Sequence, residues 1–136
     1  MGMSSQKQGT LGEIIFLKEA VKRDLKVSKP FSHHNKYDFI IDDDENLYRV
    51  QIKSCRMEGK GNGYRVRICN GNGSYGKKSA YGKNEIDFFG IYLVPVETWF
   101  IIPRKATANN KSVYLLPNDK SSKYGKYQEN WGFEYF

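Results

Sequence analysis

The sequence predicts a small α/β fold, in which one amphipathic helix precedes a series of β-strands. Three observations indicate this class. Apolar residues between positions 11 and 25 recur at spacings of three and four, residues 37–54 alternate between apolar and polar, and residues 86–94 are almost continuously apolar. The 136 residues can close one hydrophobic core, and 39% hydrophobic residues favour folding over disorder. We therefore expect a single domain over residues 1–136.

The helix comes first and carries its apolar residues along one stripe: Leu11, Ile14, Ile15, Leu17, Val21 and Leu25. It ends before Pro30. Its start is open, because Thr10 and Glu13 form a capping-box pattern whereas Ser4 or Ser5 would begin the helix earlier. Glu13 therefore has a structural interpretation beside any chemical one.

The strands follow the helix. Residues 37–42 and 47–54 both alternate with a period of two and flank the polar turn 43–46, which predicts a β-hairpin. A third strand is expected over 64–69, a buried central strand over 86–94, a strand over 98–102 that stops at Pro103, and a short edge strand over 113–116. The aromatic tail, with Trp131, Phe133, Tyr135 and Phe136, is expected to dock on the core.

The formal net charge of +7 is unevenly distributed. Residues 53–83 carry eight Lys and Arg against one acid, whereas residues 38–52 carry five acids against one Arg. An acidic segment beside a basic, glycine-rich one indicates a cation site that faces a polyanion. For the basic segment alone, an ordinary solvated surface is the alternative.

Other features exclude several classes of protein. No apolar run approaches the roughly 20 residues of a membrane span, and the polar N-terminus lacks the apolar core of a signal peptide. Cys55 and Cys69 do not make a disulfide framework, and their spacing argues against zinc. We expect an intracellular, cytoplasmic protein with no membrane association.

The hairpin geometry brings three functional groups together. With a four-residue loop at 43–46, opposed residues have numbers that sum to a constant, which places Asp38 opposite Gln51 at roughly 4.5–5.5 Å between Cβ atoms. Lys53 follows on the same face, on the order of 7 Å along the strand. A carboxylate, an amide oxygen and the backbone carbonyl of Ile52 suit Mg²⁺, and an ammonium group suits the phosphate under attack. An ordinary polar pair on a surface hairpin is the alternative.

The order of these residues resembles the PD-(D/E)xK nuclease superfamily, most closely the small intron-encoded homing endonucleases and the archaeal Holliday-junction resolvases. Gly12-Glu13 stands on the N-terminal helix, Asp38 enters a strand, and Val50-Gln51-Ile52-Lys53 follows. The resemblance implies a restriction-endonuclease-like central mixed β-sheet flanked by helices, dependence on Mg²⁺ with Mn²⁺ as a substitute, and DNA as the substrate. Tyr37 occupies the position of the motif's Pro, and Gln51 replaces the usual acid.

By this resemblance, Glu13 is the helix-borne acid that reaches the metal, Asp38 the principal ligand, Gln51 the second-strand ligand and Lys53 the catalytic lysine. Asp87 is a minor candidate, since it opens a buried strand and can be structural. The acids of the turn 42–45 are expected to form a solvated turn rather than to add ligands.

These observations predict a Mg²⁺-dependent endonuclease that cuts double-stranded DNA at specific sites. A Holliday-junction resolvase acting on branched DNA and a non-catalytic DNA-binding module are the alternatives. One active site does not easily cut two strands, so a homodimer or homotetramer is expected. The expected DNA contacts are the basic residues of the glycine-rich segment and its strand: Lys60, Arg65, Arg67, Lys77, Lys78 and Lys83. The unit Tyr-Gly-Lys occurs three times, at 75, 81 and 124, and suits phosphate contact with ring stacking, although chance explains it equally well.

Overall fold

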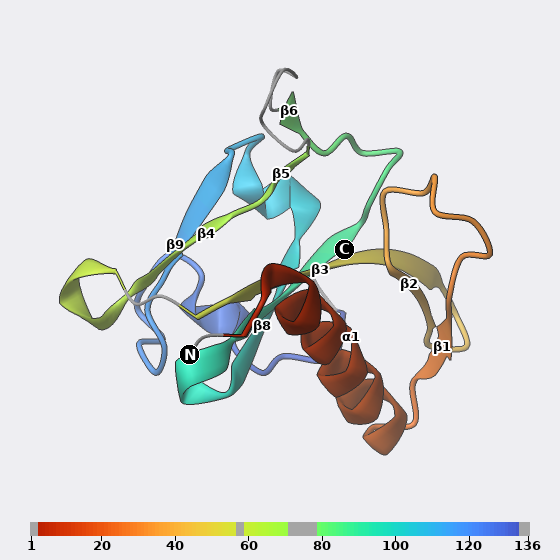
Figure 1. Ribbon diagram of the computed structural model, residues 1–136, viewed down its shortest axis with the longest axis horizontal. Helices are drawn as coiled ribbons and strands as arrows, with labels where there is room; N and C mark the ends of the chain where they lie inside the picture. The colour runs from red at the N-terminus through yellow and green to blue at the C-terminus, as the bar shows by residue number, and fades with distance from the viewer. Residues whose placement is uncertain (1–2, 57–58, 71–78, 134–136) are drawn as a thin grey trace.

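The computed structural model describes residues 3–56, 59–70 and 79–133. A mixed five-stranded sheet is its centre, in the order β1 (Lys26–Ser28), β2 (Phe39–Asp42), β3 (Leu47–Cys55), β7 (Phe88–Leu93) and β8 (Thr98–Pro103). Strands β3 and β7 pair in parallel, and the other neighbours pair antiparallel. The mixed sheet predicted by the resemblance and the predicted hairpin are confirmed (Figure 1). The apolar strand β7 is buried inside the sheet between β3 and β8, as predicted, but β3 is the central strand.

Two small sheets stand beside the main one. Strand β4 (Tyr64–Arg67) pairs with β9 (Ser112–Leu115), and β5 (Cys69–Asn70) pairs with β6 (Ser79–Ala80). Short 3-10 helices lie at η1 (Lys60–Asn62), η2 (Val94–Val96), η3 (Arg104–Thr107) and η4 (Gly125–Tyr127). The third strand expected over 64–69 is therefore divided into two short strands, β4 and β5. Strand β1 was not predicted, because three residues are too few to show an alternation of apolar and polar side chains.

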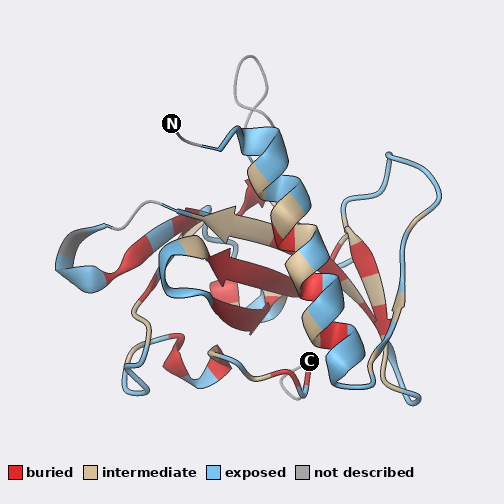
Figure 2. Cartoon of the chain, turned by 60° about the horizontal axis from the view of Figure 1, so that its bottom comes forward, coloured by how far each residue is buried: buried red, intermediate tan, exposed pale blue. Residues whose placement is uncertain are grey.

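One face of the sheet is covered by α1 (Ser5–Lys22) and by the C-terminal aromatics Trp131 and Phe133, which are buried as predicted; Tyr135 and Phe136 lie outside the described residues. The rings of Phe16 and Trp99 meet edge to face at 5.4 Å. The other face packs against β4, β9 and the segment before η4, where Tyr64, Val113 and Tyr124 are buried. In the described residues, helix α1 alone flanks the sheet as an α-helix, so strands provide the second cover that the resemblance assigns to helices (Figure 2).

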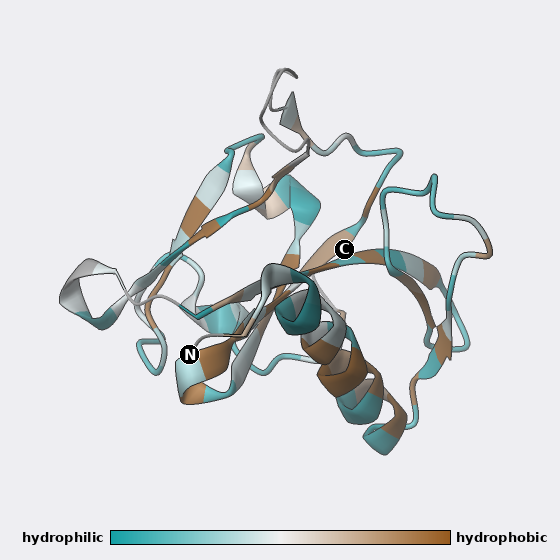
Figure 3. Ribbon diagram, viewed as in Figure 1, coloured by the Kyte–Doolittle hydropathy of each residue, from teal (hydrophilic) through white to brown (hydrophobic). Residues whose placement is uncertain are grey.

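The buried face of α1 differs from the predicted apolar stripe. Gly12, Phe16 and Ala20 are the buried residues of the helix, whereas Ile14 is 58% exposed and Val21 57% exposed. The reason is that the helix backbone lies close to β3 at Gly12, where an added Cβ would lie 3.6 Å from the Cβ of Ser54. Two small residues one turn on either side of Phe16 let its ring reach the sheet, and part of the apolar stripe faces outward (Figure 3). None of the described helices is both long and apolar enough to cross a membrane.

Candidate active site

The hairpin β2–β3 has the predicted register. Phe39 pairs with Val50 and Asp42 with Leu47, so the loop comprises residues 43–46. Asp38 precedes the first residue of β2 and donates its backbone N–H to the carbonyl of Val50 at 2.8 Å. The same register continued by one residue sets Asp38 opposite Gln51. Asp42 and Asp43 accept backbone N–H groups within the turn, and Asp44 pairs with Lys26, as the turn interpretation predicts.

The Asp38 carboxylate is held where the two strands part. Strand β2 begins at Phe39 while β3 continues to Cys55, and the Ile52 N–H donates to Asp38 Oδ2 at 2.7 Å. Burial raises the pKa of Asp38 above its ordinary value, the Ile52 hydrogen bond opposes this, and the nearby Glu13 raises it further. A carboxylate that has lost water and keeps further lone pairs is suited to accept a cation.

Glu13 reaches the same place from α1. The helix begins at Ser5 and is capped by the Ser4 hydroxyl, which accepts the Lys7 N–H at 3.2 Å, so the capping-box interpretation of Glu13 is wrong. Gln8 donates to Ser54 Oγ at 3.0 Å and anchors the helix on β3. Glu13 and Asp38 line one cleft of about 530 Å³, together with residues of the segment 29–37.

Lys29 is the present partner of the Glu13 carboxylate. Its Nζ lies 3.2 Å from Glu13 Oε1, and the side chain of Lys29 is 67% exposed. An ion pair this open contributes little to stability. The Lys29 ammonium can therefore move aside at small cost when another cation approaches the two acids.

Two residues near Asp38 carry neutral oxygens: Gln51, which the register sets opposite Asp38, and Ile52, whose N–H donates to Asp38. The Gln51 Nε2 lies 3.4 Å from the carbonyl oxygen of Ile52. In the part of the chain that the structure describes, no three His, Cys, Asp or Glu side chains group closely enough to hold a metal ion. The donors are two carboxylates, an amide oxygen and a backbone carbonyl. This set fits Mg²⁺, which binds through one or two carboxylates and keeps several waters, and does not fit zinc.

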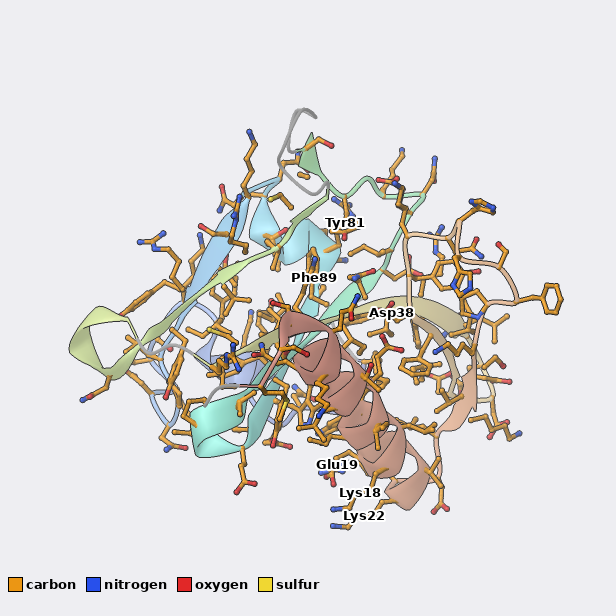
Figure 4. All side chains as sticks on the ribbon, viewed as in Figure 1. Lys18, Glu19, Lys22, Asp38, Tyr81 and Phe89 are labelled. Carbon is orange, nitrogen blue, oxygen red and sulfur yellow. The ribbon has the colours of Figure 1, made fainter. Side chains whose placement is uncertain are left out.

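Lys53 is half-buried and lies next to Tyr81, which the sequence did not single out as a site residue. Lys53 Nζ lies 3.4 Å from the hydroxyl of Tyr81 and 5.4 Å from the centre of its ring. Burial lowers the pKa of Lys53, and the Asp38 carboxylate opposes this. Burial also raises the pKa of Tyr81 to about 12, so its phenol stays protonated at neutral pH. Figure 4 shows Tyr81 beside Phe89, which meets the tyrosine ring edge to face at 5.7 Å.

The sole sequence signal for Tyr81 was the Tyr-Gly-Lys unit, and its interpretation was wrong for two of the three copies. Tyr81 is 6% exposed and Tyr124 is 4% exposed, so neither ring can stack on DNA. Both are core residues of the sheet face that carries β4 and β9. The copy at Tyr75 lies outside the described residues.

The basic residues expected to contact DNA do not all lie on one element. Arg65 and Arg67 are exposed on β4, on the side opposite the buried Tyr64 and Val66, as the alternation predicts. Cys55 Sγ lies 3.9 Å from the carbonyl oxygen of Arg65, so β4 runs beside the end of β3, the strand that carries Lys53. The exposed Lys83 follows Tyr81 along the chain, Lys60 lies in η1, and Lys77 and Lys78 lie outside the described residues.

Asp87 has a structural role. Its carboxylate accepts the backbone N–H of Arg49 at 2.8 Å and the guanidinium Nε and NH2 at 3.1 and 3.0 Å. The same guanidinium donates to the carbonyls of Lys83 and Asn84. Arg49 thus joins β3 to the entry of β7, and these bonds account for the buried carboxylate.

Comparison with known proteins agrees with this geometry. A sequence profile of the PD-(D/E)XK endonuclease family matches residues 3–134, and the chain belongs to that family. The protein is thus an endonuclease by family. Its structure is similar to that of the bacterial homing endonuclease I-Ssp6803I, with a TM-score of 0.80 and 24% sequence identity over 95% of this chain and 91% of the other. That likeness shows a shared fold.

A weaker similarity is to MepB, with a TM-score of 0.47 and 16% identity over 96% of this chain and 99% of that one. No curated protein matches the sequence.

Proposed function

We propose that the protein is a Mg²⁺-dependent DNA endonuclease that makes site-specific double-strand cuts, in the manner of a homing or restriction-like enzyme. One observation carries the proposal: Asp38, held by the Ile52 N–H, shares a cleft with Glu13 at the point where β2 and β3 part. Membership of an endonuclease family and a fold shared with a homing endonuclease support it.

Glu13, Asp38, the Gln51 side chain and the Ile52 carbonyl would hold the metal, with Mn²⁺ as a substitute for Mg²⁺. When bound, the ion neutralises charge on the phosphate that is cut. With Gln51 in place of an acid, the protein supplies one negative charge fewer, so Glu13 must contribute to holding the metal. The Lys29 ammonium then has to leave Glu13, which its exposure permits.

Lys53 acts on the attacking water and on the phosphate. Because burial lowers its pKa, its Nζ gives up a proton more readily than an exposed lysine does, and can orient or deprotonate the water. The new bond forms between the water oxygen and phosphorus, the bond to the leaving oxygen breaks, and that oxygen takes up a proton. In its protonated form, Nζ stabilises the charge that grows on the phosphate oxygens.

Tyr81 is a positioning residue in this proposal. Its hydroxyl can accept a hydrogen bond from Lys53 Nζ, and its ring is fixed against Phe89. A four-carbon lysine chain otherwise samples many rotamers, and fixing a group in reacting geometry lowers the barrier. Tyr81 itself remains protonated and does not act as a base.

The DNA would lie across β4 and the neighbouring basic segments. Arg65 and Arg67 suit bidentate contacts with guanine edges, and Lys83 suits a phosphate. The same assignment extends to Lys60, Lys77 and Lys78. To cut both strands, two copies must act together, so the proposed active form is a homodimer or homotetramer.

Incubation of the purified protein with Mg²⁺ and two substrates tests the proposal: a library of linear duplexes and a four-way DNA junction. The proposed enzyme cuts both strands of the linear duplex at one sequence. Symmetric nicks in the junction alone would identify a resolvase. Binding without cleavage in Mg²⁺ or Mn²⁺ would identify a DNA-binding module and refute the nuclease assignment. Gln51 favours this alternative because it removes one negative charge from the metal site.

A further inference from the structure

The segment between β1 and β2, residues 29–38, forms one wall of the candidate active site. It lines the 530 Å³ cleft that contains Glu13 and ends at Asp38 itself. Figure 1 shows it as the long orange loop that stands out from the edge of the sheet beside β2. We call residues 29–37 the β1–β2 loop. A substrate phosphate that reaches Asp38 must therefore pass close to this loop.

The composition of the β1–β2 loop is suited to contact with a polyanion. Its titratable side chains are Lys29, His33, His34, Lys36 and Tyr37, and the loop contains no acid. Lys29 is already held at the cleft by Glu13, and its Nζ lies 5.7 Å from the centre of the Phe39 ring. The loop thus brings positive charge to the cleft, and this charge is separate in sequence from that of the basic stretch 53–83.

Phe31 is the unexpected residue of the β1–β2 loop. It is 106% exposed, compared with 66% for Leu47 and 58% for Ile14, and no other large hydrophobic side chain in the described residues is as exposed. A single ring among cationic and polar residues is not the contiguous apolar patch that a protein partner needs. A nucleobase is the partner of matching chemistry, because it offers a flat face to stack on and carries its phosphates alongside.

We propose that the β1–β2 loop is a DNA-contacting element and that Phe31 stacks on a base beside the phosphodiester that is cut. This inference rests on the proposed nuclease function and extends it to a specific side chain. An aromatic ring placed next to the cleavage site can hold a base out of, or at the edge of, the duplex stack, and so fix the position of the neighbouring phosphate.

Substitution of Phe31 tests the inference without disturbing the fold, because the exposed ring leaves no cavity in the core when it is removed. The probe is a fluorescein-labelled duplex of mixed sequence, with divalent metal withheld so that it stays uncut. Phe31→Ala should weaken binding roughly 5- to 100-fold, the range for one lost base–aromatic stack. The salt dependence of affinity should not change, because no charge is removed. Phe31→Tyr should retain affinity, and Phe31→Leu should lose it.

Leu47→Ala is the matched control, because Leu47 is also exposed but adjoins the acidic turn of the hairpin. Fluorescence gives a second readout. The native Trp99 and Trp131 are buried, so DNA should quench the emission of Phe31→Trp and leave that of Leu47→Trp unchanged. Unaltered affinity in Phe31→Ala, or no quenching of Phe31→Trp when DNA is bound, would overturn this inference alone. If the unsubstituted protein binds no DNA, the proposed function fails with it.

Discussion

Tyr81→Phe is the most informative single substitution in the candidate site. It removes one oxygen atom, the hydroxyl 3.4 Å from Lys53 Nζ, and keeps the ring that packs on Phe89. The substitution therefore separates positioning of the lysine from packing of the core. Tyr124→Phe is the matched control, because Tyr124 belongs to the same Tyr-Gly-Lys pattern and is equally buried.

The expected size follows from the contact. Hydrogen bonds to charged groups contribute about 1.5–3 kcal/mol, and a separation of 3.4 Å is long, so we expect the loss of about 1–1.5 kcal/mol. That corresponds to roughly a tenfold lower kcat. KM should be unchanged, because a side chain that is 6% exposed does not reach the DNA. The melting temperature should move by no more than a few degrees.

Single-turnover cleavage over a range of pH is the assay. Without the hydroxyl, the Lys53 ammonium loses a hydrogen-bond acceptor, so the pKa of Lys53 should fall further and the limb of the rate profile that follows it should move to lower pH. A purely structural tyrosine would change the melting temperature and leave this limb in place. If kcat and the pH profile of Tyr81→Phe match those of Tyr124→Phe, the positioning role is refuted.

Three further predictions concern the same cluster and its approach. Lys53→Met should lower cleavage by at least ~10²-fold yet raise stability in EDTA at neutral pH, because burial disfavours the ammonium. Because the pKa of Lys53 is lower in the folded protein than in the unfolded chain, the unfolded chain binds more protons between these two pKa values. The stability of the wild type therefore rises with pH up to the ordinary lysine pKa, and calorimetry should show the extra stability of Lys53→Met shrinking in alkali. Gln51→Glu should bind Mg²⁺ more tightly in a calorimetric titration, and weaker binding would contradict the ligand role. Arg67→Ala should relax sequence preference by about 1–3 kcal/mol in a cleavage-site selection, whereas an unchanged site profile would remove Arg67 from the DNA surface.

The part of the site that lies on the hairpin could be predicted from the sequence. A period of two and a four-residue turn leave little freedom. Once the loop is 43–46, Phe39 must face Val50, and a slip of β2 by one residue would turn the buried Ile41 out of the core. The position of Asp38 follows from that register. Its hydrogen bond with the Ile52 N–H does not, because that bond depends on where β2 begins.

The rest could not be predicted because it depends on contacts between distant segments. Apolar periodicity indicated the helix, but its buried face was decided by the small residues Gly12 and Ala20, which carry almost no hydrophobic signal. Tyr81 lies 28 residues from Lys53 in the chain, and its packing in the core, where it contacts Phe89, brings it there. In the sequence Phe31 is an ordinary apolar residue, and only the structure shows that it lies outside the core.

Cleavage of supercoiled plasmid by the wild-type protein and by Asp38→Asn, across a titration of Mg²⁺, tests the central claim most directly. The amide can still accept the Ile52 N–H, so the fold and the cleft should be preserved while one metal-binding charge is lost. We predict cleavage that rises with Mg²⁺ and stops in EDTA for the wild type, with a loss of at least ~10²-fold for Asp38→Asn at unchanged DNA affinity. Equal cleavage by both proteins, or full cleavage in EDTA, would contradict the assignment of this cluster as the active site.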